Sequence, residues 1–120
     1  MKKILLVEDD EHMSRMYKKL FTFGGFQVIV AEDGISGFQK AKDVNPDLII
    51  LDVMMPHMNG LELLEKIKND SGMQSIPIVM LTNLDIQKDI DYALEKGAIL
   101  YIIKNDHEPR KVFEMVKNLV

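Results

Sequence analysis

The sequence predicts an α/β fold in which five β-α units form one doubly wound parallel sheet with helices on both faces. Five short runs of apolar residues recur at fairly even intervals, and each is nearly free of polar residues, as strands covered on both faces require. Segments with helical periodicity alternate with these runs, and such alternation builds a parallel sheet through right-handed crossovers. No repeat, linker or low-complexity tract interrupts the pattern, so we expect one domain over residues 1–120.

The first two units are defined by apolar spacing and by the turn residues between them. A strand over residues 4–7 leads into a helix with apolar positions at i, i+3, i+4, i+7 and i+8, which Gly24-Gly25 ends. A strand over 28–30 leads through Asp33-Gly34 into a helix over 35–44, which Asn45-Pro46 stops. This second helix has the weakest pattern of the five. The apolar positions are Met13, Met16, Tyr17, Leu20 and Phe21 in the first helix, and Phe38 and Ala41 in the second.

The last three units follow the same rules. Strands over residues 48–51, 78–81 and 100–103 are almost wholly apolar, and a helical pattern follows each. Gly97 fits the end of the fourth helix, whereas Pro109 fits the first turn of the fifth, with Glu108 extended before it. The apolar stripes expected to be buried are Leu61, Leu64 and Ile67 in the third helix, Ile86, Ile90, Ala93 and Leu94 in the fourth, and Val112, Phe113, Val116 and Leu119 in the fifth.

Composition and charge exclude several classes of protein. The chain has 47% apolar and 28% charged residues and no cysteine, which excludes a disulfide scaffold and fits a reducing compartment. The apolar run at the N-terminus stops at Val7, too early for an export signal, and no stretch approaches the roughly 20 apolar residues of a membrane span. A net charge of −4 with scattered Lys and Arg argues against nucleic acid as the main ligand. We therefore expect a cytoplasmic protein that binds neither nucleic acid directly nor a membrane.

Polar side chains follow four of the five predicted strands. In open parallel sheets, ligands bind beyond the carboxyl ends of the strands, so these side chains should share one rim. Taken alone, some have ordinary explanations, because either Asp9 or Asp10 could cap the first helix and Thr82 could be a loop hydroxyl. Together they indicate chemistry. The residues are Glu8, Asp9 and Asp10 after the first strand, Asp52 after the third, Thr82 after the fourth and Lys104 after the fifth.

The carboxylates at this rim need a neutralising cation. Like charges about 4 Å apart repel by roughly 4 kcal/mol at an effective dielectric constant near 20. The Lys104 ammonium and a divalent cation are the two candidates, and an all-oxygen site with few protein ligands suits magnesium. The three histidines, at positions 12, 57 and 107, lack the spacing of zinc ligands.

In order and spacing, these residues resemble the response-regulator receiver family of two-component signalling over essentially the whole chain. The segment Val7-Glu8-Asp9-Asp10 resembles the acidic pair after the family's first strand. The segment Leu51-Asp52-Val53-Met54-Met55-Pro56-His57-Met58-Asn59-Gly60 resembles its phosphorylation loop. Thr82 resembles the switch hydroxyl, Tyr101 the switch aromatic residue and Lys104 the family's lysine. The flavodoxin-like strand order 2-1-3-4-5 is implied by this resemblance and carried over from the family.

The resemblance implies a phospho-accepting signalling switch rather than an enzyme. Asp52 would receive a phosphoryl group from a histidine kinase or a histidine phosphotransfer protein, in a reaction that depends on Mg²⁺. The metal ligands implied are Asp9, Asp52 and the backbone carbonyl of Met54, with Glu8 acting through water.

The resemblance also assigns the residues that would read the phosphoryl group. Lys104 would pair with it, Thr82 would move in to hydrogen-bond it, and Tyr101 would then turn inward. The output would form on the face made by the fourth helix, the fifth strand and the fifth helix. The acidic fourth helix favours a monomer, and both a free-standing receiver and a part of a larger regulator fit the chain.

Three residues depart from the family's pattern. Asn105 follows Lys104 where the family commonly has proline, so we expect a differently shaped loop into the fifth helix. Asn83 follows Thr82 where a small residue is usual, and Met54 is apolar where a polar group often guides an attacking water. These last two departures predict slow loss of the phosphoryl group.

Three other classes fit parts of the pattern. A haloacid dehalogenase-type phosphatase also has a nucleophilic Asp after a strand, but needs a second Asp where this chain has Met54. A flavin carrier of similar topology cradles a phosphate after its first strand, where the three carboxylates of this chain would repel it. A degenerate receiver that serves only as a binding module would have no need of intact Asp9, Asp52, Thr82 and Lys104.

Overall fold

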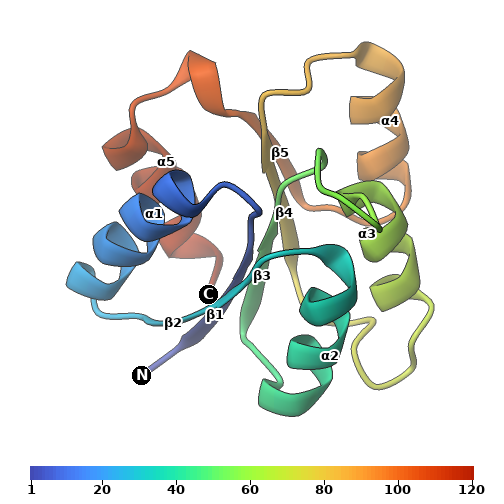
Figure 1. Cartoon of the computed structure of the whole chain (residues 1–120), viewed down its shortest axis with the longest axis horizontal. Coiled ribbons are helices and arrows are strands. Elements are labelled where there is room, and N and C mark those ends of the chain that lie inside the picture. The colour runs from blue at the N-terminus through green and yellow to red at the C-terminus, as the bar shows by residue number, and fades with distance from the viewer.

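The computed structural model describes residues 1–120 as a five-stranded parallel sheet with helices on both faces (Figure 1). The strand order is β2-β1-β3-β4-β5, so both the predicted fold class and the order are confirmed. The strands are β1 (Lys3–Val7), β2 (Gln27–Ala31), β3 (Leu48–Leu51), β4 (Ile78–Thr82) and β5 (Leu100–Ile103). The helices are α1 (Glu11–Phe23), α2 (Gly34–Val44), α3 (Gly60–Lys68), α4 (Gln87–Glu95) and α5 (Pro109–Val116), with single 3-10 turns at Lys104–Asp106 and Lys117–Leu119.

Strand residues alternate between two hydrophobic clusters, one on each face of the sheet. Ile4 and Leu6 of β1 pack with α1 and α5, whereas Leu5 and Val7 pack with α2, α3 and α4. Figure 1 shows the same division, with α1 and α5 on the left of the sheet and the other helices on its right. Burial on both faces explains why the strands are apolar throughout rather than alternating.

The predicted turn residues lie where the helices begin and end. Asn45 adopts a left-handed backbone with φ 47° at the end of α2, directly before Pro46. Gly97 follows α4 with φ 113°, a backbone that favours glycine. Pro109 is the first residue of α5, and Glu108 before it is extended, with φ −69° and ψ 150°.

The predicted burial of the fourth and fifth helices is wrong in part. Ile86 and Leu94 are each 46% exposed, and in α4 only Ala93 is buried. The reason is that α4 lies beside the edge strand β5, where the sheet covers only one side of the helix. Leu119 is also exposed, because α5 ends at Val116 and Leu119 belongs to the 3-10 turn that follows.

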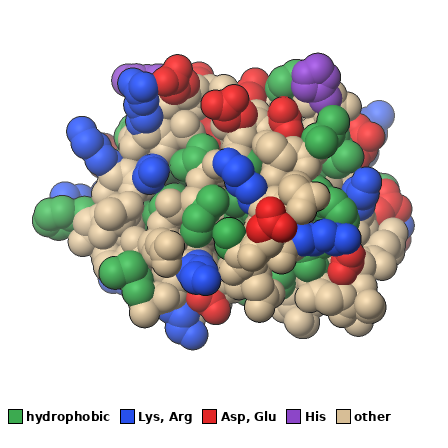
Figure 2. All heavy atoms as spheres, turned by 60° about the horizontal axis from the view of Figure 1, so that its bottom comes forward, with side chains coloured by type: hydrophobic (Ala, Val, Ile, Leu, Met, Phe, Trp, Pro, Cys, Tyr) green, Lys and Arg blue, Asp and Glu red, His purple; other side chains and the backbone are tan.

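The surface gives no sign of a continuous basic stripe on the face in view. In Figure 2, Lys and Arg side chains are separated by polar and apolar surface rather than joined. No helix of the structure has both the length and the apolar character that a membrane span requires.

Candidate functional site

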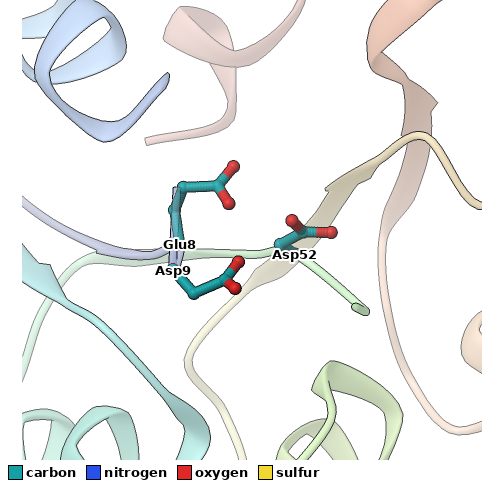
Figure 3. A group of neighbouring side chains, drawn as sticks. All are labelled: Glu8, Asp9 and Asp52. Carbon is teal, nitrogen blue, oxygen red and sulfur yellow. The ribbon is translucent and has the colours of Figure 1, made fainter. Parts of the chain in front are cut away.

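The carboxyl ends of four strands bring the predicted site residues to one edge of the sheet. β1 and β3 pair in parallel with Val7 beside Leu51, and the backbone N–H of Asp52 donates to the Val7 carbonyl over 3.0 Å. The residues that follow these two strands are therefore neighbours. Figure 3 shows the Glu8 and Asp9 carboxylates extending from the end of β1 toward Asp52.

Glu8, Asp9 and Asp52 form a cluster that could hold a metal ion. One carboxylate oxygen from each lies within 4.8 Å of the others. Glu8 and Asp52 are only 3% and 6% exposed, whereas Asp9 is exposed, so the cluster is closed on the protein side and open to solvent at Asp9. Three hard oxygen ligands around an open position suit a divalent cation that keeps bound water.

Asp10 does not belong to this cluster. Its carboxylate accepts a hydrogen bond from the Met13 backbone N–H over 3.0 Å and caps the N-terminus of α1. The sequence left open which of the two aspartates caps the helix. In the structure Asp10 is the cap, and Asp9 belongs to the cluster.

Lys104 supplies the positive charge that the sequence requires. Its ammonium donates to Glu8 Oε1 and, over 3.2 Å, to Asp52 Oδ2, and all three side chains are buried. Burial alone lowers the pKa of the Lys104 ammonium, but hydrogen bonds and attraction from the two carboxylates outweigh it and raise the pKa overall. Lys104 is therefore charged at neutral pH and ties the ends of β1, β3 and β5 together.

Glu8 holds its proton to a higher pH than an ordinary glutamate does. Burial raises the pKa of its carboxyl from 4.5 to about 7, with the nearby Asp52 adding to the effect and Lys104 opposing it. Near neutral pH, a divalent cation at the cluster would compete with a proton on Glu8, so we expect cation binding to tighten as pH rises.

This raised pKa predicts that stability depends on pH. Between the unfolded pKa of 4.5 and the folded pKa of about 7, the folded protein holds a proton on Glu8 that the unfolded chain releases. The stabilisation is therefore complete below pH 4.5 and is lost as pH rises through 7. Urea denaturation in EDTA should show the decline in wild type and a flatter profile in Glu8→Gln. Glu32→Gln, at an exposed position, should keep the wild-type slope; an unchanged slope in Glu8→Gln would contradict the prediction.

Thr82 and Tyr101 are both held by the backbone of one residue, Leu84. Thr82 is fully buried, and its hydroxyl oxygen accepts from the Leu84 N–H over 3.2 Å. The Tyr101 hydroxyl donates to the Leu84 carbonyl over 2.7 Å, and burial raises the pKa of Tyr101 to about 12. The two residues that the sequence paired as a switch are thus linked through the loop between β4 and α4.

One further predicted site residue, Met54, lies beside the cluster. Met54 lines the same pocket, of about 390 Å³, and its backbone N–H donates to Asp52 Oδ1 over 3.3 Å. Met13 of α1 also lines this pocket and was missed by sequence reasoning, because as part of an apolar helix stripe it gives no signal of a site. Leu84 was missed for a related reason, since it acts through backbone groups that every residue has.

Gly60, at the start of α3, is in close contact with the backbone of Asp52. A Cβ atom at position 60 would lie 2.1 Å from the Asp52 carbonyl oxygen and 2.8 Å from its carbonyl carbon. We expect Gly60→Ala to cost about 1–3 kcal/mol or more of unfolding free energy. The reason is that the Asp52 carbonyl belongs to the backbone and cannot turn away from the new methyl group as a flexible side chain could. Chemical denaturation measures this cost. The control is Gly72→Ala, because the nearest atom to a Cβ at position 72 would be Asp70 Oδ1, at 3.3 Å. Equal stability of the two variants would contradict the prediction.

Comparisons with known proteins agree with this geometry. A family model described as the response regulator receiver domain matches residues 4–117. The alkaline phosphatase synthesis transcriptional regulatory protein PhoP of Bacillus subtilis is 38% identical over 119 residues, covering 99% of this chain and 48% of that protein. The DNA-binding response regulator MtrA of Mycobacterium tuberculosis is 35% identical over 115 residues, covering 96% of this chain and 49% of that protein. The chain thus spans about half the length of these curated relatives.

Solved structures give the same picture. The chemotaxis protein CheY4 of Vibrio cholerae superposes with a TM-score of 0.91 at 28% identity and covers 100% of this chain and 99% of that one. A CheY-like receiver domain protein from Methanospirillum hungatei also reaches a TM-score of 0.91, at 29% identity, and covers 99% of this chain and 93% of that one.

Proposed function

This chain belongs to the response regulator receiver domain family, and from that premise we propose that Asp52 accepts a phosphoryl group from a phosphohistidine in a reaction that depends on Mg²⁺. One observation carries the proposal. The Asp52 carboxylate sits at the end of a buried strand, beside two other carboxylates and within hydrogen-bond distance of a buried lysine.

The residues around Asp52 can each be given a part in phosphoryl transfer. A carboxylate oxygen of Asp52 forms a bond to phosphorus, and the phosphorus–nitrogen bond of the donor breaks, with its electron pair left on the histidine nitrogen. Bound Mg²⁺ would supply positive charge to the phosphoryl oxygens. We propose that Glu8, Asp9, Asp52 and the Met54 carbonyl hold this ion, with Glu8 acting through water. Lys104, already placed at Asp52, would pair with the transferred group.

We propose that Thr82 and Tyr101 convert phosphorylation into a change of shape. The Thr82 hydroxyl would move away from the Leu84 N–H, from which it accepts, and donate to a phosphoryl oxygen. This move would release the loop to which the Tyr101 hydroxyl is bonded. Tyr101 would then turn inward, altering the face made by α4, β5 and α5. Two exposed apolar residues, Ile86 directly before α4 and Leu94 within it, support this face as the output surface.

The proposed partners follow from this role. A histidine kinase or a histidine phosphotransfer protein would donate the phosphoryl group, and a protein target would read the output. The net charge of −4 supports protein rather than DNA as the direct ligand.

We further propose a monomer, because α4 carries Asp89, Asp91 and Glu95 but only one basic residue, Lys88. Nothing in the site favours a phosphatase, since Met54 occupies the position of the second Asp.

Mass spectrometry of the intact protein tests the proposed function. Incubation with a small phosphodonor such as acetyl phosphate and Mg²⁺ should add one phosphoryl group to wild type. EDTA should abolish the addition. A control in which Mg²⁺ stays free and NaCl matches the ionic strength of the EDTA sample should be labelled as before. Labelling that proceeds equally in EDTA would contradict the part assigned to Mg²⁺, and no labelling under any condition would contradict the function.

We expect the phosphoryl group on Asp52 to be lost slowly. Met54 and Asn83 both line the pocket, and the Met54 side chain has no polar group to orient an attacking water. The decay of labelled protein, followed after the phosphodonor is removed, should take many minutes or longer. Met54→Asn, which offers a polar group at the same position, should decay faster. A lifetime of seconds in wild type would contradict the prediction.

A further inference from the structure

The C-terminal end of α4 is tied to α3 by one carboxylate. The Tyr92 hydroxyl donates to Glu65 Oε2 over 2.7 Å, and the Lys96 ammonium lies 3.8 Å from Glu65 Oε1. The same ammonium lies 5.5 Å from the centre of the Tyr92 ring, where a cation is attracted to the aromatic face. Both helices lie on the same side of the sheet (Figure 1). Glu65, Tyr92 and Lys96 thus form one polar cluster, the α3–α4 clasp, that joins the two helices.

Packing secures the same end of α4. Ala93 is fully buried, and its carbonyl accepts from the Ala98 N–H over 3.0 Å, just before the chain enters β5. Gly97 lies against α3, since a Cβ atom at position 97 would be 3.2 Å from Lys68 Cε. The last turn of α4 is therefore held by close packing as well as by the clasp.

The N-terminal end of α4 has no comparable support. The first three helices each begin with a side-chain cap, whereas Ile86 before α4 makes no such hydrogen bond. Residues 85–88 are all exposed. The one side-chain hydrogen bond of this turn, from Gln87 Nε2 to Asp91 Oδ1 over 2.8 Å, stays within the helix. No side chain of another element forms a hydrogen bond with this first turn.

The first turn of α4 depends instead on the loop that precedes it. The Leu84 backbone in this loop donates to the Thr82 hydroxyl oxygen and accepts from the Tyr101 hydroxyl. These are the bonds proposed to change when Asp52 is phosphorylated. Release of the loop would therefore free the N-terminal end of α4 and leave the bonds of the clasp intact.

We propose that the α3–α4 clasp is a pivot, so that phosphorylation tilts α4 about its C-terminal end instead of displacing the whole helix. This inference rests on the proposed function of Asp52. Glu65 is then a positioning residue, because it acts on the output face through α4 and touches neither the phosphoryl group nor the metal. A rigid helix moves least near its pivot, so Ile86 should move and Leu94, beside the clasp, should stay in place.

The clasp can be observed in the free protein through the Tyr92 hydroxyl. The hydrogen bond to Glu65 raises the pKa of this hydroxyl above its ordinary value of 10.0, and loss of hydration and the charges of Glu65 and Glu95 add to the shift. Carbon-13 NMR of labelled tyrosine rings should therefore give Tyr92 a raised pKa in wild type. Glu65→Gln should lower this pKa more than Glu95→Gln, which removes a charge but no hydrogen bond.

Hydrogen exchange measures what the clasp contributes to α4. Tyr92→Phe removes the hydroxyl and keeps the ring, and thermal unfolding checks that the fold is kept. In this variant the amides of residues 93–96 should exchange roughly tenfold faster than in wild type, as the loss of a hydrogen bond to a charged group predicts. Glu95→Gln changes an exposed residue of the same turn that is not bonded to α3, so it should exchange like wild type.

Beryllofluoride, a stable mimic of a phosphoryl group on aspartate, tests the pivot itself. When it is added with Mg²⁺ to wild type, amide chemical shifts should change at residues 84–88 and change little at residues 93–97. The Cζ resonance of Tyr92 should keep its position at neutral pH, because the clasp stays closed. In Tyr92→Phe the changes should extend to residues 93–97.

Three results would overturn the pivot while leaving the proposed function intact, provided that acetyl phosphate still labels wild type. A shift of Tyr92 Cζ on adding beryllofluoride would show that the clasp opens. Equal changes along all of α4 in wild type would show that the whole helix moves. Unchanged hydrogen exchange in Tyr92→Phe would show that the clasp does not hold α4. Wild type that is neither labelled by acetyl phosphate nor altered by beryllofluoride would overturn both proposals.

Discussion

Asp52→Asn should gain no phosphoryl group under conditions that label wild type fully. The amide keeps the shape of the carboxylate and can still accept from the Met54 N–H, but it has no anionic oxygen to attack phosphorus. The same change removes one of the three carboxylates of the cluster, so the rise in melting temperature on adding Mg²⁺ should also be smaller. Intact-mass spectrometry and thermal unfolding measure the two effects.

The matched control for this variant is Asp10→Asn. It removes one charge from the same rim, and asparagine still caps α1. Asp10→Asn should therefore be labelled like wild type and respond to Mg²⁺ like wild type. Labelling of Asp52→Asn to the same extent as Asp10→Asn would refute the assignment of the acceptor.

Lys104→Met should cost about 3–5 kcal/mol of unfolding free energy at neutral pH in EDTA, since it leaves two buried carboxylates without their cation. The loss should shrink as pH falls, because protonation of Glu8 removes part of the uncompensated charge. Mg²⁺ should restore part of it by supplying a replacement cation. Urea denaturation across pH, with and without Mg²⁺, measures all three effects.

An exposed lysine provides the control for Lys104→Met. Lys111→Met should change the unfolding free energy by no more than about 0.5 kcal/mol, with no special dependence on pH or Mg²⁺. If Lys104→Met behaved like Lys111→Met, the ion pairs of Lys104 with Glu8 and Asp52 would not hold the site together in solution.

The sheet and most of the site could be predicted from the sequence because both depend on simple rules. Strands such as residues 48–51 are apolar throughout when helices cover both faces, and parallel strands bring their carboxyl ends to one edge. Asp52, Thr82 and Lys104 follow such strands directly, so their meeting could be anticipated from their positions alone.

Other features depend on geometry that residue type does not encode. Asp9 and Asp10 are chemically alike, and only the position at which α1 begins makes Asp10 the cap. Leu94 fits a buried stripe in the sequence, yet α4 lies beside an edge strand that covers one side of it. The backbone N–H of Asn105 donates to Asn83 Oδ1 although the two residues are 22 positions apart in the sequence. This hydrogen bond forms because the ends of β4 and β5 are neighbours.

The most direct test of Asp52 as the acceptor locates the phosphoryl group itself. Borohydride reduces an acyl phosphate on aspartate to homoserine, and peptide sequencing by tandem mass spectrometry identifies the residue converted. After incubation with acetyl phosphate and Mg²⁺, we expect conversion at Asp52 and at no other aspartate. Conversion at Asp9 or Asp10, or a phosphoryl group that borohydride cannot convert, would contradict the claim that Asp52 is the acceptor.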